Sequence, residues 1–211
     1  MCDMKTVLCY GDSNTWGANP ETGERYSIHE RWCGVMRDHL GDGYWVLEEG
    51  LCGRTSIWMD EVCQYRSGRD YLLPCLDTHA PVDLIIIMLG TNDLKTRLHL
   101  PAEDIARGVS VLVEMVIKSG FGPNGSAPEV LVVSPPAIIE VPGNQVQFAG
   151  GVSRSRQFGV LYSAYAKQLG AHFLDAGEVI KSSQVDGIHL DVDAHFTLGR
   201  EVAKKVIDIL G

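Results

Sequence analysis

Residues 6–14 read TVLCYGDSN, a short apolar run that ends in a glycine, an aspartate and a serine. The first five residues are apolar or β-favouring, and this pattern predicts a buried strand over Thr6–Tyr10. Gly11 permits the sharp turn that would end the strand. We therefore expect Ser13 at the carboxyl end of a strand, where open α/β sheets bind their ligands.

Working outward from this stretch, strand and helix patterns alternate along the chain. The other expected strands are Trp45–Glu49, Leu84–Leu89, Val130–Ser134 and His172–Asp175. Apolar residues at helical spacing predict helices over Trp32–Leu40, Tyr71–His79, Pro101–Ile117, Arg154–Leu169 and Asp193–Leu210. Asp70 is expected to cap the second of these helices. The alternation predicts an α/β fold, with a five-stranded parallel sheet and helices on both faces. A chain of 211 residues fits a single domain, 1–211.

Composition bounds the partners and the compartment. The net charge of −9 argues against nucleic acid and against anionic membrane surfaces, since both attract a basic face. No apolar stretch reaches the ~18 residues that would span a bilayer, and Met1–Lys5 leads into the first strand without signal-peptide features. The six cysteines include no Cys-x-x-Cys pair, so we expect reduced thiols and a cytoplasmic protein. An extracellular disulfide framework is the alternative.

An Asp-x-x-His pattern near the carboxyl terminus, Asp186 and His189, offers Ser13 a chemical partner. A serine hydroxyl is a weak nucleophile unless a neighbouring base removes its proton. His189 is the candidate base, and Asp186 would orient its ring. Taken alone, Ser13 could equally be a turn residue and His189 a surface histidine. Cys52 is an alternative nucleophile.

The same region could instead hold a metal ion. Acidic and imidazole side chains recur at Asp186, His189, Asp191, Asp193 and His195. Such groups bind divalent metals, but the run lacks both the EF-hand spacing and the His-Glu-x-x-His pattern. We therefore expect no metal site here, and we expect Asp191 and Asp193 to be solvated acids at the start of the last helix.

Two more polar segments follow expected strands. Residues 51–55 read LCGRT and follow the second strand, and residues 90–93 read GTND and follow the third. If the strands are parallel, both segments lie at the same sheet edge as Ser13. In order, Gly-Asp-Ser, Gly53, Gly-Thr-Asn-Asp and Asp-x-x-His resemble the four signature blocks of the SGNH hydrolases, also called GDSL-type esterases. The blocks span Gly11–His189, nearly the whole chain.

The resemblance is strongest to a bacterial arylesterase and acyltransferase branch, through residues 11–17 (GDSNTWG), 48–51 (EEGL), 87–93 (IMLGTND) and 186–189 (DGIH). It implies a three-layer, flavodoxin-like sheet with strand order 2-1-3-4-5. It also implies a Ser13–His189–Asp186 triad and an oxyanion hole formed by the Ser13 N–H, the Gly53 N–H and the Asn92 amide. No metal or organic cofactor is implied. Locally, Asn92 could instead be a turn or capping residue and Gly53 a simple loop glycine.

Some residues near the blocks need separate interpretations. The family commonly has leucine after the serine and often has serine before the third-block glycine, whereas this chain has Asn14 and Cys52. These two residues and Trp16 are candidate substrate-binding residues, with a core position as the alternative for Trp16. The acids that adjoin the blocks, Asp12 and Asp93, are assigned structural duties such as capping. Two cations, Arg54 and Lys95, adjoin the expected oxyanion residues. We interpret them either as contacts to a polar leaving group or as solvated charges.

A long segment, Pro135–Val152, has an apolar centre and no regular pattern. Segments of this length are usually functional or mobile. Its apolar residues could contact a pocket, another subunit or the protein's own helices. We expect a subunit interface or a pocket entrance, because the resembled branch includes homo-oligomers.

These observations predict a serine esterase that hydrolyses short-chain or aryl carboxylic esters, or transfers their acyl group, through an acyl-enzyme on Ser13. The alternatives with the same fold are a carbohydrate O-deacetylase and a lysophospholipase. A further alternative is a non-catalytic flavodoxin-like module that binds a phosphorylated ligand at the strand ends. Against that module, the sequence has no Walker or dinucleotide glycine pattern.

Overall fold

The computed structural model describes residues 4–211, so Cys2 and the beginning of the segment Met1–Lys5 lie outside the described residues. Five parallel strands form one sheet with the order β2-β1-β3-β4-β5. The strands are β1 (Lys5–Gly11), β2 (Tyr44–Gly50), β3 (Leu84–Met88), β4 (Glu129–Ser134) and β5 (His172–Asp175). The observed order is the expected 2-1-3-4-5, and all five predicted strands are confirmed.

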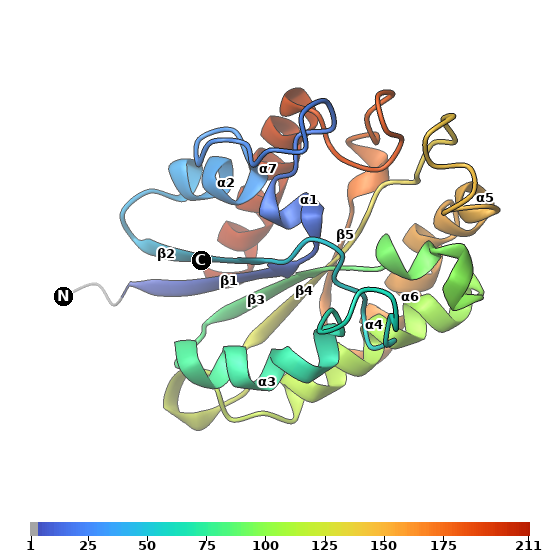
Figure 1. The fold of residues 1–211 in the computed structure, drawn as a ribbon. Helices are drawn as coiled ribbons and strands as arrows, with labels where there is room; N and C mark the ends of the chain where they lie inside the picture. Colours follow the sequence, from blue (N-terminus) through green and yellow to red (C-terminus); the bar gives the residue numbers. More distant parts are fainter. Residues whose placement is uncertain (1–3) are drawn as a thin grey trace.

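Helices cover both faces of this sheet (Figure 1). The helices are α1 (Ser13–Trp16), α2 (Trp32–Leu40), α3 (Gly68–His79), α4 (Ala102–Ile117), α5 (Gly151–Ser155), α6 (Phe158–Leu169) and α7 (Val192–Leu210). Helices α2 and α7 pack together on one face, and α3, α4 and α6 lie on the other. The three-layer architecture expected from the alternating pattern is therefore confirmed.

Strand β1 shows why two layers of helices are needed. Leu8 and Tyr10 face the core beneath α3, α4 and α6, whereas Val7 and Cys9 face the core beneath α2 and α7. All four side chains are fully buried. Successive side chains of a strand point to opposite faces, so a continuous apolar run is the pattern of a central strand covered on both sides.

Two local predictions need correction. The helix expected over Arg154–Leu169 is two helices, α5 and α6, separated at residues 156–157. Asp70 is not the cap of α3, which begins at Gly68 after Ser67; the carboxylate lies in the first turn, where it favours the helix dipole. Asp191 is exposed at the start of the last helix, as expected, and its side chain also caps α7 by accepting a hydrogen bond from the Ala194 N–H at 2.9 Å.

The segment Pro135–Val152 packs on its own subunit. Ile138 and Phe148 are buried in the core beneath α4 and α6, and only Val146 among its large apolar side chains is strongly exposed, at 89%. The protein's own helices therefore bury Ile138 and Phe148. The expected subunit interface at this segment stays a prediction, for which Val146 is an exposed apolar side chain.

Candidate active site

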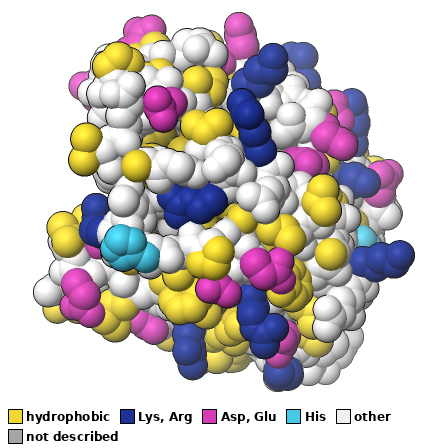
Figure 2. All heavy atoms as spheres, turned by 90° about the vertical axis from the view of Figure 1, so that its right-hand side faces the viewer, with side chains coloured by type: hydrophobic (Ala, Val, Ile, Leu, Met, Phe, Trp, Pro, Cys, Tyr) yellow, Lys and Arg dark blue, Asp and Glu magenta, His cyan; other side chains and the backbone are white. Residues whose placement is uncertain are grey.

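The strand register brings the motifs that follow β1, β2 and β3 to one edge of the sheet. Gly11, the last residue of β1, pairs with Gly50 of β2 on one side and with Met88 of β3 on the other. The segments that leave these strands carry Ser13, Gly53 and Asn92. Figure 2 shows the face toward which the strands run, where acidic, basic and apolar side chains are intermixed. The expected placement at one sheet edge is confirmed.

A buried carboxylate starts the helix that carries the candidate nucleophile. Asp12 precedes α1, and its side chain accepts a hydrogen bond from the Asn14 N–H at 2.9 Å. This bond satisfies one of the free N–H groups at the helix start. Burial raises the pKa of Asp12 to about 6. The structural duty predicted for Asp12 is confirmed, and Ser13 becomes the first residue of α1.

Ser13, His189 and Asp186 form a continuous chain of hydrogen bonds. Nε2 of His189 lies 2.9 Å from Oγ of Ser13, and Nδ1 lies 2.5 Å from Oδ2 of Asp186. An ionised carboxylate can only accept, so Nδ1 carries the proton and Nε2 is left to accept from the serine hydroxyl. This is the tautomer that a general base requires.

The turn between Asp186 and His189 holds the carboxylate in place. Its Oδ1 accepts hydrogen bonds from the N–H groups of Ile188 and His189, both at 2.9 Å. Partial burial opposes ionisation, but the hydrogen bonds from His189 and these two amides lower the pKa of Asp186. Gly187 has φ of 75°, and a Cβ there would lie 2.0 Å from a facing carbonyl oxygen. Only glycine fits this turn.

That facing carbonyl belongs to the long segment Pro135–Val152. Nδ2 of Asn144 donates to the carbonyl oxygens of Ile139 and Asp186, both at 2.8 Å, and Oδ1 accepts from the Val141 N–H at 3.1 Å. The N–H of Ile139 also donates to the carbonyl of Gly187 at 2.7 Å. Sequence reasoning missed Asn144, because no local pattern marks a contact across 42 residues.

Asn14 also supports the Asp186–His189 turn. Its Oδ1 accepts from the Leu190 N–H at 3.2 Å, and its Nδ2 donates to the Ile188 carbonyl at 3.3 Å. The side chain is only 2% exposed. The expectation that Asn14 lines a substrate pocket is therefore wrong in this structure: its amide is consumed in joining α1 to the backbone on both sides of His189.

Three potential oxyanion donors lie beyond the strand ends. Within residues 4–211, the backbone N–H groups of Ser13 and Gly53 donate to no protein acceptor. Gly53 has φ of 83°, a conformation that favours glycine. Nδ2 of Asn92 lies 3.5 Å from the Asp12 carboxylate, and the side chain is 8% exposed. An Asn amide carries two protons, so one remains for a ligand.

A second buried carboxylate holds the segment after Gly53. Asp93 accepts hydrogen bonds from the Ser56 N–H, at 3.0 Å, and from the Ser56 hydroxyl, at 2.5 Å. Burial raises the pKa of Asp93 to about 6. The structural duty predicted for Asp93 is thus confirmed, with Ser56 as a partner that the sequence did not reveal.

The two neighbouring cations are internal rather than solvated. Arg54 is 2% exposed; its Nη1 donates to the Gly11 carbonyl at 2.9 Å and to that of Glu49, and its guanidinium lies 4.1 Å from the centre of the Tyr10 ring. Lys95 is buried against Asp60 at 3.2 Å. Both readings given for these cations are wrong, since neither side chain is free to meet a leaving group or water.

Two predicted substrate contacts remain accessible. Cys52 is exposed, and Trp16 is partly exposed beside Arg25, whose guanidinium carbon lies 5.3 Å from its ring centre. Trp16 is therefore not a core tryptophan. The five described cysteines, Cys9, Cys33, Cys52, Cys63 and Cys75, are free thiols.

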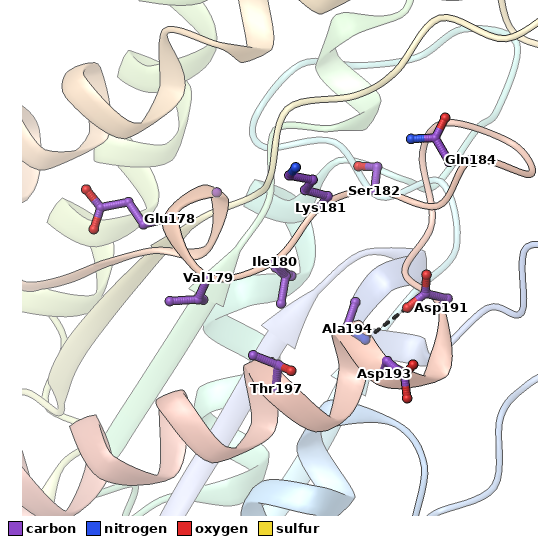
Figure 3. Close-up of a pocket in the computed structure, with 11 residues that line it drawn as sticks. Glu178, Val179, Ile180, Lys181, Ser182, Gln184, Asp191, Asp193, Ala194 and Thr197 are labelled. Carbon is purple, nitrogen blue, oxygen red and sulfur yellow. Dashed lines mark hydrogen bonds between the residues drawn. The ribbon is translucent and has the colours of Figure 1, made fainter.

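The acidic and imidazole residues after position 185 have divided roles. His195 is fully buried, its Nδ1 accepts from the Trp32 N–H at 3.2 Å, and burial lowers its pKa to about 3. It is therefore a neutral core histidine. A cavity of about 470 Å³ lies between residues 177–184 and the start of α7 (Figure 3). Asp191 and Asp193 line this cavity, but none of the triad residues does.

The described residues form no helix long and apolar enough to cross a bilayer.

Comparisons with solved structures give close matches over the full length. An aryl esterase from M. smegmatis is 43% identical and superposes with a TM-score of 0.93, covering 97% of this chain and 99% of its own. A carbohydrate acetylesterase from Sinorhizobium meliloti is 40% identical, with the same TM-score and coverage. A lipase/acylhydrolase from Enterococcus faecalis, 14% identical with a TM-score of 0.67, covers 96% of this chain and 95% of its own and shares the fold. No curated protein sequence matches the chain. The model of the GDSL-like lipase/acylhydrolase family matches residues 9–197, so the chain belongs to that family.

Proposed function

We propose that Ser13, His189 and Asp186 form the catalytic triad of this carboxylic ester hydrolase. The observation that carries the proposal is the unbroken contact from Ser13 Oγ through His189, 2.9 Å and 2.5 Å on its two sides, to Asp186. This order of nucleophile, base and orienting acid is the one that acyl transfer requires. Membership of the family and the close esterase structures support the same activity.

In the proposed reaction, Oγ of Ser13 bonds to the ester carbonyl carbon while its proton passes to Nε2 of His189. The carbonyl electron pair moves to the oxygen, which the Ser13 N–H, the Gly53 N–H and the Asn92 amide stabilise. When the intermediate collapses, the C–O bond to the alcohol breaks and His189 returns the proton to the leaving alkoxide. A water molecule, or another alcohol, then repeats the sequence on the acyl-enzyme. The chain's residues supply every group that these steps need.

We propose short-chain or aryl esters as substrates, with Cys52 and Trp16 as contacts at the opening of the site. The solved aryl esterase, 43% identical, supports this choice. The carbohydrate O-deacetylase alternative is supported by the acetylesterase at 40% identity. The lysophospholipase and binding-module alternatives have no comparable support. Transfer to an alcohol in place of water is part of the proposal.

We also propose that the protein is a cytoplasmic homo-oligomer. The free state of the five described thiols supports a reducing compartment. Exposed apolar side chains in the segment 57–66 support a covered surface there: Met59 is 63% exposed, Val62 73% and Tyr65 90%. Analytical ultracentrifugation tests this assignment. A monomer at micromolar concentration would contradict it.

The test of the triad is labelling with an organophosphonate, followed by peptide mass spectrometry. We expect one adduct per chain, on Ser13, and loss of p-nitrophenyl ester hydrolysis in proportion to labelling. Cys52→Ala should label like the wild-type protein, because the thiol is not the nucleophile, whereas Ser13→Ala should not label. If protein that was active before the reaction is fully labelled and carries no adduct on Ser13, the assignment is overturned. A chain-length series of p-nitrophenyl esters and acetylated sugars then separates the substrate classes.

A further inference from the structure

A separate cluster, outside the triad, brings together a thiol, an imidazole and a carboxylate. Cys75 and His79 lie four residues apart on α3, so their side chains share one helix face. Glu49 lies near the end of β2. Sγ of Cys75, a ring nitrogen of His79 and a carboxylate oxygen of Glu49 all lie within 4.8 Å of one another. Nε2 of His79 is 3.0 Å from Oε1 of Glu49.

We propose that Glu49, Cys75 and His79 bind a zinc ion. Zinc takes sulfur, imidazole nitrogen and carboxylate oxygen at about 2.0–2.3 Å in a tetrahedron, which separates the ligand atoms by about 3.3–3.8 Å. One pair of donors is 3.0 Å apart, and all three lie within 4.8 Å of one another. Side-chain rotations would have to close the remaining difference.

The burial of the three side chains is suited to a bound ion. Cys75 is fully buried, whereas the side chains of His79 and Glu49 are 22% and 23% exposed. An ion would therefore enter from the side of His79 and Glu49 and reach the thiol last. The fourth position of the tetrahedron is on the open side, where water would complete the coordination.

The charges of the site balance on binding. Burial raises the pKa of Cys75 to about 12, so the thiol is protonated in the absence of a metal ion. Binding breaks the S–H bond, forms an S–Zn bond and releases the proton to solvent, while His79 binds as the neutral imidazole. One thiolate and one carboxylate neutralise the divalent ion. The neutral unit can therefore lie near the cationic Arg54, whose charge also favours the thiolate.

The site is connected to the oxyanion segment through the backbone. The carbonyl of Glu49 accepts a hydrogen bond from Arg54, the residue after Gly53. An ion that joins Glu49 to α3 would fix the end of β2 just before this segment. Because the folded chain gathers the ligands and the unfolded chain does not, zinc would stabilise the folded state.

The test is titration of chelator-washed protein with Zn²⁺ by calorimetry, and with Co²⁺ by absorption spectroscopy. We expect one site per chain and a sulfur-to-cobalt charge-transfer band in the near ultraviolet. His79→Gln should weaken binding by about 100-fold or more, since it removes a direct ligand. Zn²⁺ should raise the Tm of the wild-type protein but not that of His79→Gln.

Matched variants separate this site from other histidines and thiols. His172→Gln is the control, because His172 also pairs with a glutamate, Glu129, at 3.2 Å but has no thiol partner. It should bind as the wild-type protein does. His189→Ala should also retain the binding, which excludes the triad as the site. Cys75→Ser should abolish the charge-transfer band; if that variant does not fold, His79→Gln alone decides. No charge-transfer band, or wild-type affinity in His79→Gln, would overturn the proposal.

Discussion

Replacement of Asn14 by alanine tests whether one buried amide holds the triad in place. Asn14 is the link between α1, which begins with Ser13, and the backbone on both sides of His189. Alanine is a good helix former, so the change should not disturb α1 through its helix propensity. What it removes is the acceptor for the Leu190 N–H and the donor to the Ile188 carbonyl.

The magnitude follows from the burial of those two groups. Leu190 is fully buried, so its unpaired N–H should cost about 1–3 kcal/mol. The Ile188 carbonyl is on a partly buried residue and should cost about 0.5–1.5 kcal/mol, because water can replace part of the lost bond. The total is about 1.5–4.5 kcal/mol in the free energy of unfolding. For a domain of this size, that corresponds to a Tm lower by about 3–18 °C.

Catalysis should fall as well, because His189 lies between the two released residues. A displacement of about 1 Å at a catalytic group can cost about 100-fold, so we expect kcat to fall by about 10- to 100-fold. Urea unfolding and p-nitrophenyl acetate hydrolysis measure the two effects. Asn19→Ala is the control, since the Asn19 side chain makes only an exposed bond, to the Glu21 N–H at 2.8 Å. If Asn14→Ala is no less stable than this control and equally active, the reasoning is refuted.

Four other predictions follow from the site. Ser13→Ala and His189→Ala should each lower kcat by several orders of magnitude, and the double variant should lose little more, because triad members act as a unit; near-normal steady-state turnover by Ser13→Ala would rule out the mechanism. Asn92→Ala should lower kcat by about 100- to 1,000-fold with Tm unchanged, whereas a lower Tm with normal kcat would make Asn92 a capping residue. Asp93, with its pKa raised from 3.8 to about 6, contributes stability that is fully present below pH 3.8 and is lost as the pH rises through 6. Asp93→Asn should therefore show a smaller fall in unfolding free energy between pH 5 and pH 7 than the wild-type protein, and equal falls would contradict the assignment. Gly187→Ala should reduce both kcat and Tm, because its Cβ would lie 2.0 Å from a carbonyl oxygen; kinetics and thermal unfolding check both, and a variant unchanged in both would contradict the close contact.

The strands could be predicted because their signals are local, whereas their order was implied only by the resemblance to a known family. An apolar run such as Thr6–Tyr10, closed by Gly11, specifies a covered strand without reference to the rest of the chain. The contact between Ser13 and His189 joins residues 176 positions apart. The chemistry of the two residue types suggested the pair, and the resemblance of their motifs to a known family implied it. Local periodicity would have left both residues as ordinary turn and surface positions.

The supporting groups could not be predicted, since each pairs a polar side chain with a distant backbone. Asn14 takes the place of the leucine that is common in the family, which indicates a pocket residue, but its amide turns toward residues 188–190. Arg54 lies beside an expected oxyanion residue, which indicates a leaving-group contact or a solvated charge, yet its guanidinium lies on the Tyr10 ring. The break between α5 and α6 falls in the polar run 153–157 (SRSRQ), which contains no proline or glycine to mark the end of a helix.

The three hydrogen bonds of Asn144 make the segment Pro135–Val152 a structural part of the Asp186–His189 turn. A segment fixed in this way cannot be exchanged as an independent module. If the corresponding segment of a relative replaced it, both the substrate range and the geometry of the triad could change. A loss of activity in such a chimera would therefore reveal nothing about the substrate. Engineering of specificity would therefore start better at Cys52 and Trp16, which are accessible and hold no part of that turn.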